Sequence, residues 1–405
     1  MTNSRSISHA VRLVSVAVLT LGAASFAADP LQPDSATQLR LLEPPILAPS
    51  MRVGIFDLHP DITTGVTYDD NFALSPTNKL ADWIWTITPH LSAVADNTAD
   101  GYGSTLTLDY APSFVIFTSH PGDDSIDQHA RLSASWVGNK LSLSLIQQFD
   151  QTDGGVAEVG ERIRQRHYLT ALGTKYKLGE RTSVELNPRL DIGDPENHIG
   201  YTEYAADFFL NRVITSKITG SVGGSAGYID VTDGSNQIYQ RALGRVAYGL
   251  SGKVDLVASA GAEWRQFTGN ESDTATPVFG VGMAYRPFES TTITLEGRRR
   301  DEVSISDTNA TYTATGVTLG IRQRLLERLY ATLRGGFDYH DYRGQTPGIS
   351  GSRRDDIYLL RAGIGTHFGR HWTLDVFYQF SEDDTNDPTA GFIDHQFGLL
   401  CNWKL

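Results

Sequence analysis

The chain has 405 residues, of which 40% are hydrophobic, and a formal net charge of -13. The hydrophobic share is too low for the repeated runs of about 20 apolar residues that a helical membrane protein needs, and the 17 Tyr, 17 Phe and 6 Trp are too many for a disordered chain. The acidic balance argues against a nucleic-acid partner, and a single cysteine excludes a disulfide framework or a cysteine-based zinc site.

The first 52 residues are predicted to contain an export signal followed by a tail. Arg5 and Arg12 form a basic start, and residues 13–21 (LVSVAVLTL) are apolar but too short to cross a bilayer. This pattern predicts a secretory signal peptide over residues 1–27, with an amphipathic N-terminal helix as the alternative. Residues 28–52 carry several prolines and no apolar period, so we interpret them as a Pro-rich periplasmic tail.

The rest of the chain alternates between apolar and polar side chains. In residues 183–192 (SVELNPRLDI), Val184 and Leu186 fall on one face, and Glu185 and Arg189 fall on the other. A period of two is the period of a β-strand. The same alternation recurs to the C-terminus, so the rest of the chain is predicted to be all-β.

About eighteen strands, within two either way, are expected over residues 53–405. Short and long connections alternate between them, from two-residue turns such as 138–139 to loops such as 151–160 and 343–352. Short periplasmic turns and longer extracellular loops are typical of an outer-membrane barrel. The strands are expected, in chain order, near residues 62–71, 82–95, 104–118, 127–137, 140–150, 161–177, 182–192, 200–213, 217–231, 237–249, 253–268, 276–287, 291–306, 310–324, 328–342, 353–368, 371–382 and 391–404.

A soluble β-sandwich alternates in the same way and is the alternative fold. Its strands are usually about 5–6 residues long, whereas a tilted strand needs about 9–11 residues to cross hydrocarbon, and the strands expected here have the longer length. The sequence therefore predicts a transmembrane antiparallel up-and-down β-barrel of about 18 strands (16–18). Tryptophans near the strand ends suit the aromatic girdles of such a barrel: Trp83, Trp85, Trp136, Trp264, Trp372 and Trp403.

The polar face of the strands is expected to line the interior. A barrel of about 16–18 strands leaves an aqueous channel unless a loop or plug fills it, and charged rings in a channel set ion or solute selectivity. Salt bridges that only stiffen the wall are the alternative, and the two roles are compatible. The lumen candidates are Arg131, Glu185, Arg189, Asp191, Asp207, Asp255, Glu263, Arg265, Glu296, Arg298, Arg322, Arg334, Asp338, Arg361 and Asp375.

The long connections are acidic, as Glu382, Asp383 and Asp384 illustrate. Carboxylate oxygens can bind Ca²⁺ or Mg²⁺, but the spacing matches no EF-hand loop. Solvated loop surface is therefore the favoured interpretation, and no metal site is predicted.

The sequence favours a protein without catalytic activity. There is no H-E-x-x-H motif, and His367 and His371, although four residues apart, flank a predicted turn and not a helical face. A triad assembled across strands is the alternative that would make the barrel an enzyme. No catalytic residue and no cofactor are predicted, and Cys401, which shares a strand face with Trp403, is expected to face lipid.

One segment resembles a known family. Residues 58–91 read LHPDITTGVTYDDNFALSPTNKLADWIWTITPHL, a strand ending in Tyr-Asp-Asp-Asn, a loop, and a second strand ending in Thr-Pro-x-Leu. This resembles the outer-membrane β-barrel porin family of the β-barrel porin 2 type, which is associated with exopolysaccharide biosynthesis operons; over the remaining barrel the similarity is architectural only. The matching residues are Tyr68, Asp69, Asp70, Asn71, Thr88, Pro89 and Leu91.

The resemblance implies an outer-membrane protein with a role in transport or in polysaccharide export. Many such barrels end in an aromatic residue that the barrel-assembly machinery reads, whereas this chain ends in Trp403-Lys404-Leu405. The expected function is a porin-like channel in the outer membrane of a Gram-negative-type bacterium. A structural or adhesive barrel with a closed lumen is the alternative. The expected partners are outer-membrane lipid and lipopolysaccharide, the barrel-assembly machinery and an exported polysaccharide.

Overall fold

The structure is a computed structural model of the chain. It describes residues 51–405 except 233, 251, 270, 307–310 and 344–351. The predicted signal peptide (1–27) and nearly all of the predicted tail (28–52) lie outside the described residues. Over the described ranges, no helix is both long and apolar enough to cross a bilayer.

Long strands make up almost the whole described chain, together with one short 3-10 helix, η1 (Pro121–Asp123). The strands are β1 (Met51–Val53), β2 (Phe56–Asp69), β3 (Asp82–Ala99), β4 (Tyr102–Phe117), β5 (Ser125–Val137), β6 (Leu141–Val156), β7 (Glu161–Lys177), β8 (Thr182–Pro195), β9 (Tyr201–Val213), β10 (Ile218–Val231), β11 (Gln237–Leu250), β12 (Val254–Phe267), β13 (Thr274–Phe288), β14 (Thr291–Val303), β15 (Thr311–Arg324), β16 (Leu329–Arg343), β17 (Arg354–Phe368), β18 (Trp372–Thr385) and β19 (Phe392–Lys404).

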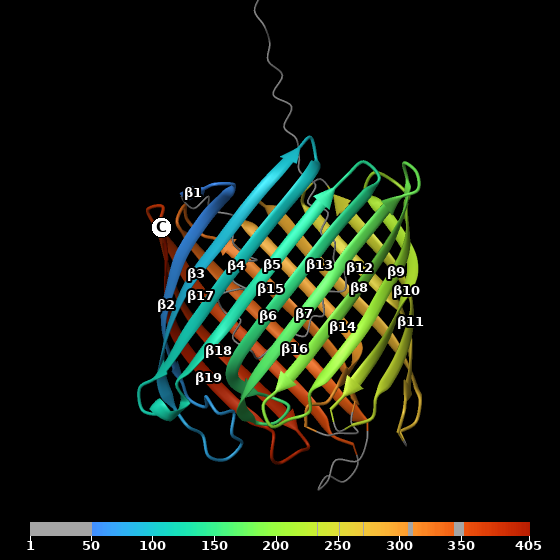
Figure 1. Ribbon diagram of the computed structural model, residues 1–405. Helices are drawn as coiled ribbons and strands as arrows, with labels where there is room; N and C mark the ends of the chain where they lie inside the picture. Colours follow the sequence, from blue (N-terminus) through green and yellow to red (C-terminus); the bar gives the residue numbers. More distant parts are fainter. Residues whose placement is uncertain (1–50, 233, 251, 270, 307–310, 344–351) are drawn as a thin grey trace, which may run out of the picture.

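Strands β2 to β19 form one closed ring, in which each strand pairs antiparallel with the next along the chain (Figure 1). The last strand closes on the first, with Phe397 opposite Tyr68, and the short β1 pairs only with β2. Closure leaves no long sheet edge unpaired. The predicted antiparallel barrel of about eighteen strands is confirmed.

The two ends of the barrel differ in their connections. At one end, which we call the turn end, consecutive strands are joined by two to four residues; at the other, the loop end, the strand bounds leave four to twelve. The described chain ends at the turn end, where Figure 1 marks the C-terminus. The loop predicted over 151–160 is only 157–160, because β6 and β7 stay paired as far as Val156 and Glu161.

The wall is apolar outside and polar inside, which is the reverse of a soluble protein. In β8, Leu186 is 50% exposed while Asp191 is 1% exposed. Large apolar side chains such as Val222, Ile364 and Phe397 are likewise exposed. An apolar outer face is favourable where hydrocarbon, and not water, surrounds the barrel.

Pro89 interrupts the β3–β4 ladder without shifting its register. Between β3 and β4 the ladder stops after Ile87 and resumes at Leu91 in the same register, and Pro89 lies in this gap. No extra residue enters the strand at Pro89, so the register is the same on both sides of the gap. The missing proline N–H removes ladder bonds only locally.

Inward-facing glycines leave room for aromatic rings. Gly227 lies opposite Tyr239, and a Cβ on Gly227 would come within 2.4 Å of that ring. The ring of Phe377 covers Gly398 in the same way, at 2.3 Å from a Cβ placed there. Part of the glycine content is therefore explained by rings that lie flat on the inner wall.

Candidate functional site: the barrel interior

The lumen candidates can be placed by following the strand register, because residues opposite each other in a ladder share a face. Asp191 is buried and faces inward, so its ladder partner Glu203 on β9 also faces inward. Applying the same rule from each strand to the next assigns the inward face of every strand in the ring. All of the candidates lie on the inward face: Arg131, Glu185, Arg189, Asp191, Asp207, Asp255, Glu263, Arg265, Glu296, Arg298, Arg322, Arg334, Asp338, Arg361 and Asp375.

Several of these charges form ion pairs with residues on other strands of the ring. Arg189 contacts Glu203 at 2.8 Å, and Arg245 reaches Glu185 at 2.6 Å. Arg298 pairs with Asp338 at 2.9 Å. Salt bridges within the wall are therefore present. They were one of the two roles that the sequence predicted for the lumen charges.

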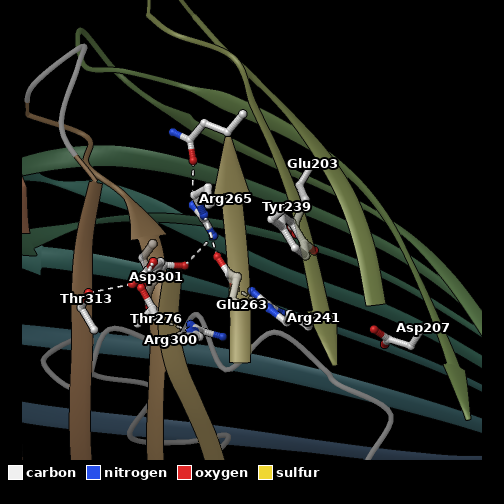
Figure 2. A network of polar contacts seen from close by, with 12 residues as sticks. Glu203, Asp207, Tyr239, Arg241, Glu263, Arg265, Thr276, Arg300, Asp301 and Thr313 are labelled. Atoms are coloured by element: carbon white, nitrogen blue, oxygen red, sulfur yellow. Dashed lines mark hydrogen bonds and ion pairs between the residues drawn. The ribbon is translucent and has the colours of Figure 1, made fainter. Parts of the chain in front are cut away.

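The tightest of these groups surrounds Glu263 on β12. Its carboxylate accepts from Arg265 Nε at 2.7 Å and from Arg241 Nε at 2.5 Å, and Arg265 also donates to the Asp301 carbonyl at 3.0 Å. Glu263 is 0% exposed and Arg265 is 1% exposed. Figure 2 shows Arg265 held between Glu263 and Asp301, with the Tyr239 ring nearby. This group ties β11, β12 and β14 together.

A different arrangement occurs on β15, β16 and β17, which we call the arginine sector: Arg322, Arg334 and Arg361. Arg334 and Arg361 are directly opposite each other, and like charges in that position destabilise a sheet. Arg361 lies 3.7 Å from the Phe377 ring centroid and donates to Gln379 Oε1 at 3.0 Å. Among the described residues, neither Arg322 nor Arg361 has an ion pair. Three guanidinium groups thus gather on one part of the inner wall.

Histidines and aspartates alternate along the wall from β2 to β8. His90 Nδ1 contacts Asp61 at 2.8 Å, and its Nε2 lies 3.5 Å from Asp109. On β5 to β8, His129 contacts Asp150, and His167 Nε2 contacts Asp191 at 2.7 Å.

We call this row the Asp–His belt: Asp61, His90, Asp109, His129, Asp150, His167 and Asp191. Of these residues, only Asp191 was among the lumen residues predicted from the sequence. The alternation within each strand does predict that these side chains face inward. It does not predict which of them are neighbours, because that depends on the register between strands. The belt therefore places imidazoles and carboxylates side by side on this part of the inner wall.

A serine motif was also missed, and the structure shows why it is not a nucleophile elbow. Residues 223–227 read G-x-S-x-G around Ser225. The motif acts at a turn between a strand and a helix, whereas Ser225 lies within β10, opposite Arg241.

At the loop end, apolar side chains from distant strands meet. Leu74 of the β2–β3 loop, Ala157 of the β6–β7 loop, Ile357 of β17 and Phe392 of β19 form one buried cluster. The β6–β7 loop is not a ring neighbour of β17 or β19. These residues can meet only if the loops fold over the mouth, so the loop end is bridged across the lumen.

Glu158 fastens the same bridge to a further loop. It is 9% exposed, and its Oε1 accepts from Ser304 Oγ at 2.5 Å and from the Ile305 N–H at 3.0 Å. Burial raises the pKa of Glu158, while the bonds from Ser304 and the charge of Arg353 oppose that rise. The bridge therefore contains one buried carboxyl group that holds its proton more tightly than usual.

The mouth bridge is expected to loosen as the pH rises. Because the pKa of Glu158 is raised in the closed arrangement, its protonated form favours closure. This favourable contribution is complete below the ordinary pKa of 4.5 and is lost as the pH passes through the raised value. Channel openings in a planar bilayer should become more frequent from pH 4.5 upward, and Glu158→Gln, which mimics the protonated acid, should flatten that dependence. An unchanged pH profile in Glu158→Gln would assign the titration to a group outside the mouth bridge.

The predicted girdle residues lie at two levels of the outer wall. Trp83, Trp85 and Trp264 are near the loop end, whereas Trp136, Trp372 and Trp403 are near the turn end. Trp372 and Trp403 stack with their ring centroids 5.7 Å apart. Cys401 is half-buried on the face of Trp403.

The motif of the family resemblance lies where the barrel closes. Tyr68 faces outward against Trp83, with ring centroids 5.3 Å apart, and Asp69, Asp70 and Asn71 end β2 and begin the β2–β3 loop. On β3, Thr88 hydrogen-bonds to Ser113 at 2.7 Å, Pro89 lies in the ladder gap, and Leu91 is exposed on the outer face.

No protein-family model and no curated protein matches the chain. Solved structures with a similar course of chain include Pseudomonas aeruginosa OccK3 (OpdO), with 12% identity, a TM-score of 0.46 and coverage of 86% of this chain and 95% of that one. Acinetobacter baumannii OccAB4 has 11% identity, a TM-score of 0.44 and coverage of 89% and 100%. Pseudomonas aeruginosa OccK2 (OpdF), solved in complex with glucuronate, has 11% identity, a TM-score of 0.47 and coverage of 86% and 98%. At such values the likeness carries no information on what this chain transports, and the family resemblance of residues 58–91 stays a prediction.

Proposed function

We propose that this protein is a porin-type channel of the outer membrane in a Gram-negative-type bacterium, exported by its signal peptide and passing ions or small solutes. The observation that carries the proposal is the reversed wall of a closed eighteen-stranded barrel, with exposed Leu186 outside and buried Asp191 inside. Barrels of about 16–18 strands enclose an aqueous channel. No catalytic group is part of the proposal.

The outer wall supports a transmembrane orientation. The tryptophans near the two ends, such as Trp85 and Trp372, suit the two interfaces of a bilayer. Short turns are typical of the periplasmic side, which places the described C-terminus there. Lipid and lipopolysaccharide would then contact the apolar face.

The inner wall supports a preference among charged solutes. The arginine sector is positive, whereas the Asp–His belt supplies carboxylates on other strands. A solute that carries both signs, or an anion with a polar body, would find partners on both parts of the wall. We propose small charged solutes of this kind.

Conductance of the purified protein in a planar bilayer tests the channel. Stable, ion-selective openings are expected for the wild type, and more frequent openings for Glu158→Ala, because that variant loses the hydrogen bonds that fasten the mouth bridge. Silence of both proteins over many insertions would reject the channel. It would favour the second candidate, a structural or adhesive barrel, which the bridged mouth supports.

A role in exopolysaccharide export is a finer version of the proposal and rests only on the motif from Tyr68 to Asn71 and from Thr88 to Leu91. Deleting the gene in its native strain should lower the polysaccharide recovered outside the cell, and a copy with Arg334→Gln and Arg361→Gln should restore it poorly if the polymer is anionic. Normal export in the deletion strain would restrict the function to small solutes.

A further inference from the structure

Three carboxylates gather at the loop end, where the first and last strands of the ring meet. Asp69 ends β2, Asp70 follows it, and Asp394 belongs to β19. Each offers one oxygen atom, and these three atoms all lie within 4.8 Å of one another.

Backbone and side-chain donors fix two of these groups in place. The Asn71 N–H donates to Asp69 Oδ1 at 2.8 Å, and the His395 N–H donates to Asp70 Oδ1 at 2.8 Å. The Asn71 side chain, which is 0% exposed, also donates to the Ile393 carbonyl at 3.1 Å. The loop start is thereby fastened to β19 beside Asp394.

Asp394 is the most enclosed member of the group. It is 1% exposed, and Asp69 is 6% exposed. Oδ2 of Asp394 accepts from Gln396 at 2.9 Å and from Ser381 at 3.3 Å. Its buried Oδ1 accepts no hydrogen bond from an N–H or hydroxyl group. A buried carboxylate oxygen without a partner is costly, which points to a positive ligand.

No side chain of the described residues supplies that positive charge. Within the described part of the chain, none of the three carboxylates has an ion pair with Lys, Arg or His. The nearby Lys79 donates to the Ile393 carbonyl at 2.8 Å instead. Three acidic groups in contact repel each other, so the arrangement is favourable only when a cation or a proton joins them.

The spacing fits a calcium ion. Three oxygens no more than 4.8 Å apart enclose a point that is at most 4.8/√3, about 2.8 Å, from each of them, close to the roughly 2.3–2.6 Å of Ca²⁺–oxygen bonds. Mg²⁺ demands bonds of about 2.0–2.1 Å in near-ideal octahedral geometry, which three carboxylates fixed to two different strands meet less readily than the flexible geometry of Ca²⁺. Hard carboxylate oxygens are the ligands that Ca²⁺ prefers.

We propose that Asp69, Asp70 and Asp394 form a Ca²⁺ site that fastens the closure of the barrel at its loop end. The ion would neutralise charge from both sides of the β2–β19 junction and hold the β2–β3 loop in place. The site gives the Tyr-Asp-Asp-Asn motif a physical role, in which the two aspartates are ligands and Asn71 positions them. It does not depend on whether the lumen conducts.

Isothermal titration of the calcium-free, refolded full-length protein with CaCl₂ tests the site. One ion per chain is expected, with a dissociation constant of about 10⁻⁴–10⁻³ M, the range of extracellular calcium modules. Asp394→Asn and the milder Asp70→Asn should each weaken binding at least tenfold. Asp384→Asn removes an exposed carboxylate from the adjacent strand β18 and should bind as the wild type does.

Heat-modifiable migration on mild-detergent gels gives a second readout. Ca²⁺ should raise the temperature at which the folded band disappears in the wild type and in Asp384→Asn, but not in Asp394→Asn. Equal binding by Asp394→Asn, Asp70→Asn and the wild type would overturn the proposal. So would stabilisation of the calcium-free protein by acid alone with no heat of Ca²⁺ binding, because a proton shared between Asp69 and Asp394 would then join the carboxylates.

Discussion

Replacing Glu263 with glutamine is expected to lower the free energy of unfolding of the barrel by about 3–5 kcal/mol, the usual cost of removing one partner from a buried ion pair. The substitution keeps the shape of the side chain and removes its charge. Arg265, 1% exposed, would then keep a guanidinium inside the wall without a carboxylate. Urea unfolding of the refolded protein in lipid vesicles, followed by tryptophan fluorescence, measures the loss.

An exposed pair serves as the matched control. Asp255 and Arg286 also form an ion pair, at 2.7 Å, but their side chains are 46% and 44% exposed. Asp255→Asn should therefore cost less than about 1 kcal/mol. Adding Arg265→Met to Glu263→Gln should recover part of the loss, because the unpaired buried charge is removed. Equal losses for Glu263→Gln and Asp255→Asn would show that water reaches the Glu263 group.

Neutralising the arginine sector is expected to reverse or strongly weaken any anion preference of the channel. At about 4 Å in water, one charge changes the energy of a passing ion by about 1 kcal/mol, which corresponds to about fivefold in relative permeability. Arg334→Gln combined with Arg361→Gln should therefore lower the anion-to-cation permeability ratio by up to about 25-fold at low ionic strength. Reversal potentials across a salt gradient measure this ratio.

The control for this experiment carries the same change in charge outside the lumen. Arg212 is exposed near the turn end of β9 and donates to Thr182 at 2.7 Å, so Arg212→Gln should leave the reversal potential within twofold of the wild type. The effect of the double variant should shrink as salt is added, because the Debye length falls. An unchanged ratio in Arg334→Gln/Arg361→Gln would leave the sector a purely structural role.

Most of the fold can be predicted from short stretches of the sequence. A period of two, as in Glu185 and Leu186, is a property of neighbouring residues, and so are the glycines of tight turns such as Gly369 (φ 64°). Strand parity also places Arg334 and Arg361 on the inward face. Their direct juxtaposition is different, because it depends on which residue of β16 faces which residue of β17, and one sequence does not state that register.

The same reasoning explains what the sequence could not show about the loop end. Glu158 and Ser304 are 146 residues apart, and no periodicity links them. The Asp–His belt also requires the register of consecutive ladders to be known. Contacts across the lumen are therefore the part of the molecule that only the folded barrel reveals, and they include the mouth bridge on which opening is proposed to depend.

The junction between β2 and β19 also sets the order of folding events. The hydrogen bond from His395 to Asp70 joins residues 325 positions apart, so it closes one of the longest chain segments in the molecule and has a large entropic cost. Neighbouring hairpins form at far smaller separation and need not wait for it. The ring can thus close only once β19 is present in the barrel. A chain cut short before β19 would keep unpaired edges on β2 and β18, and such edges promote aggregation.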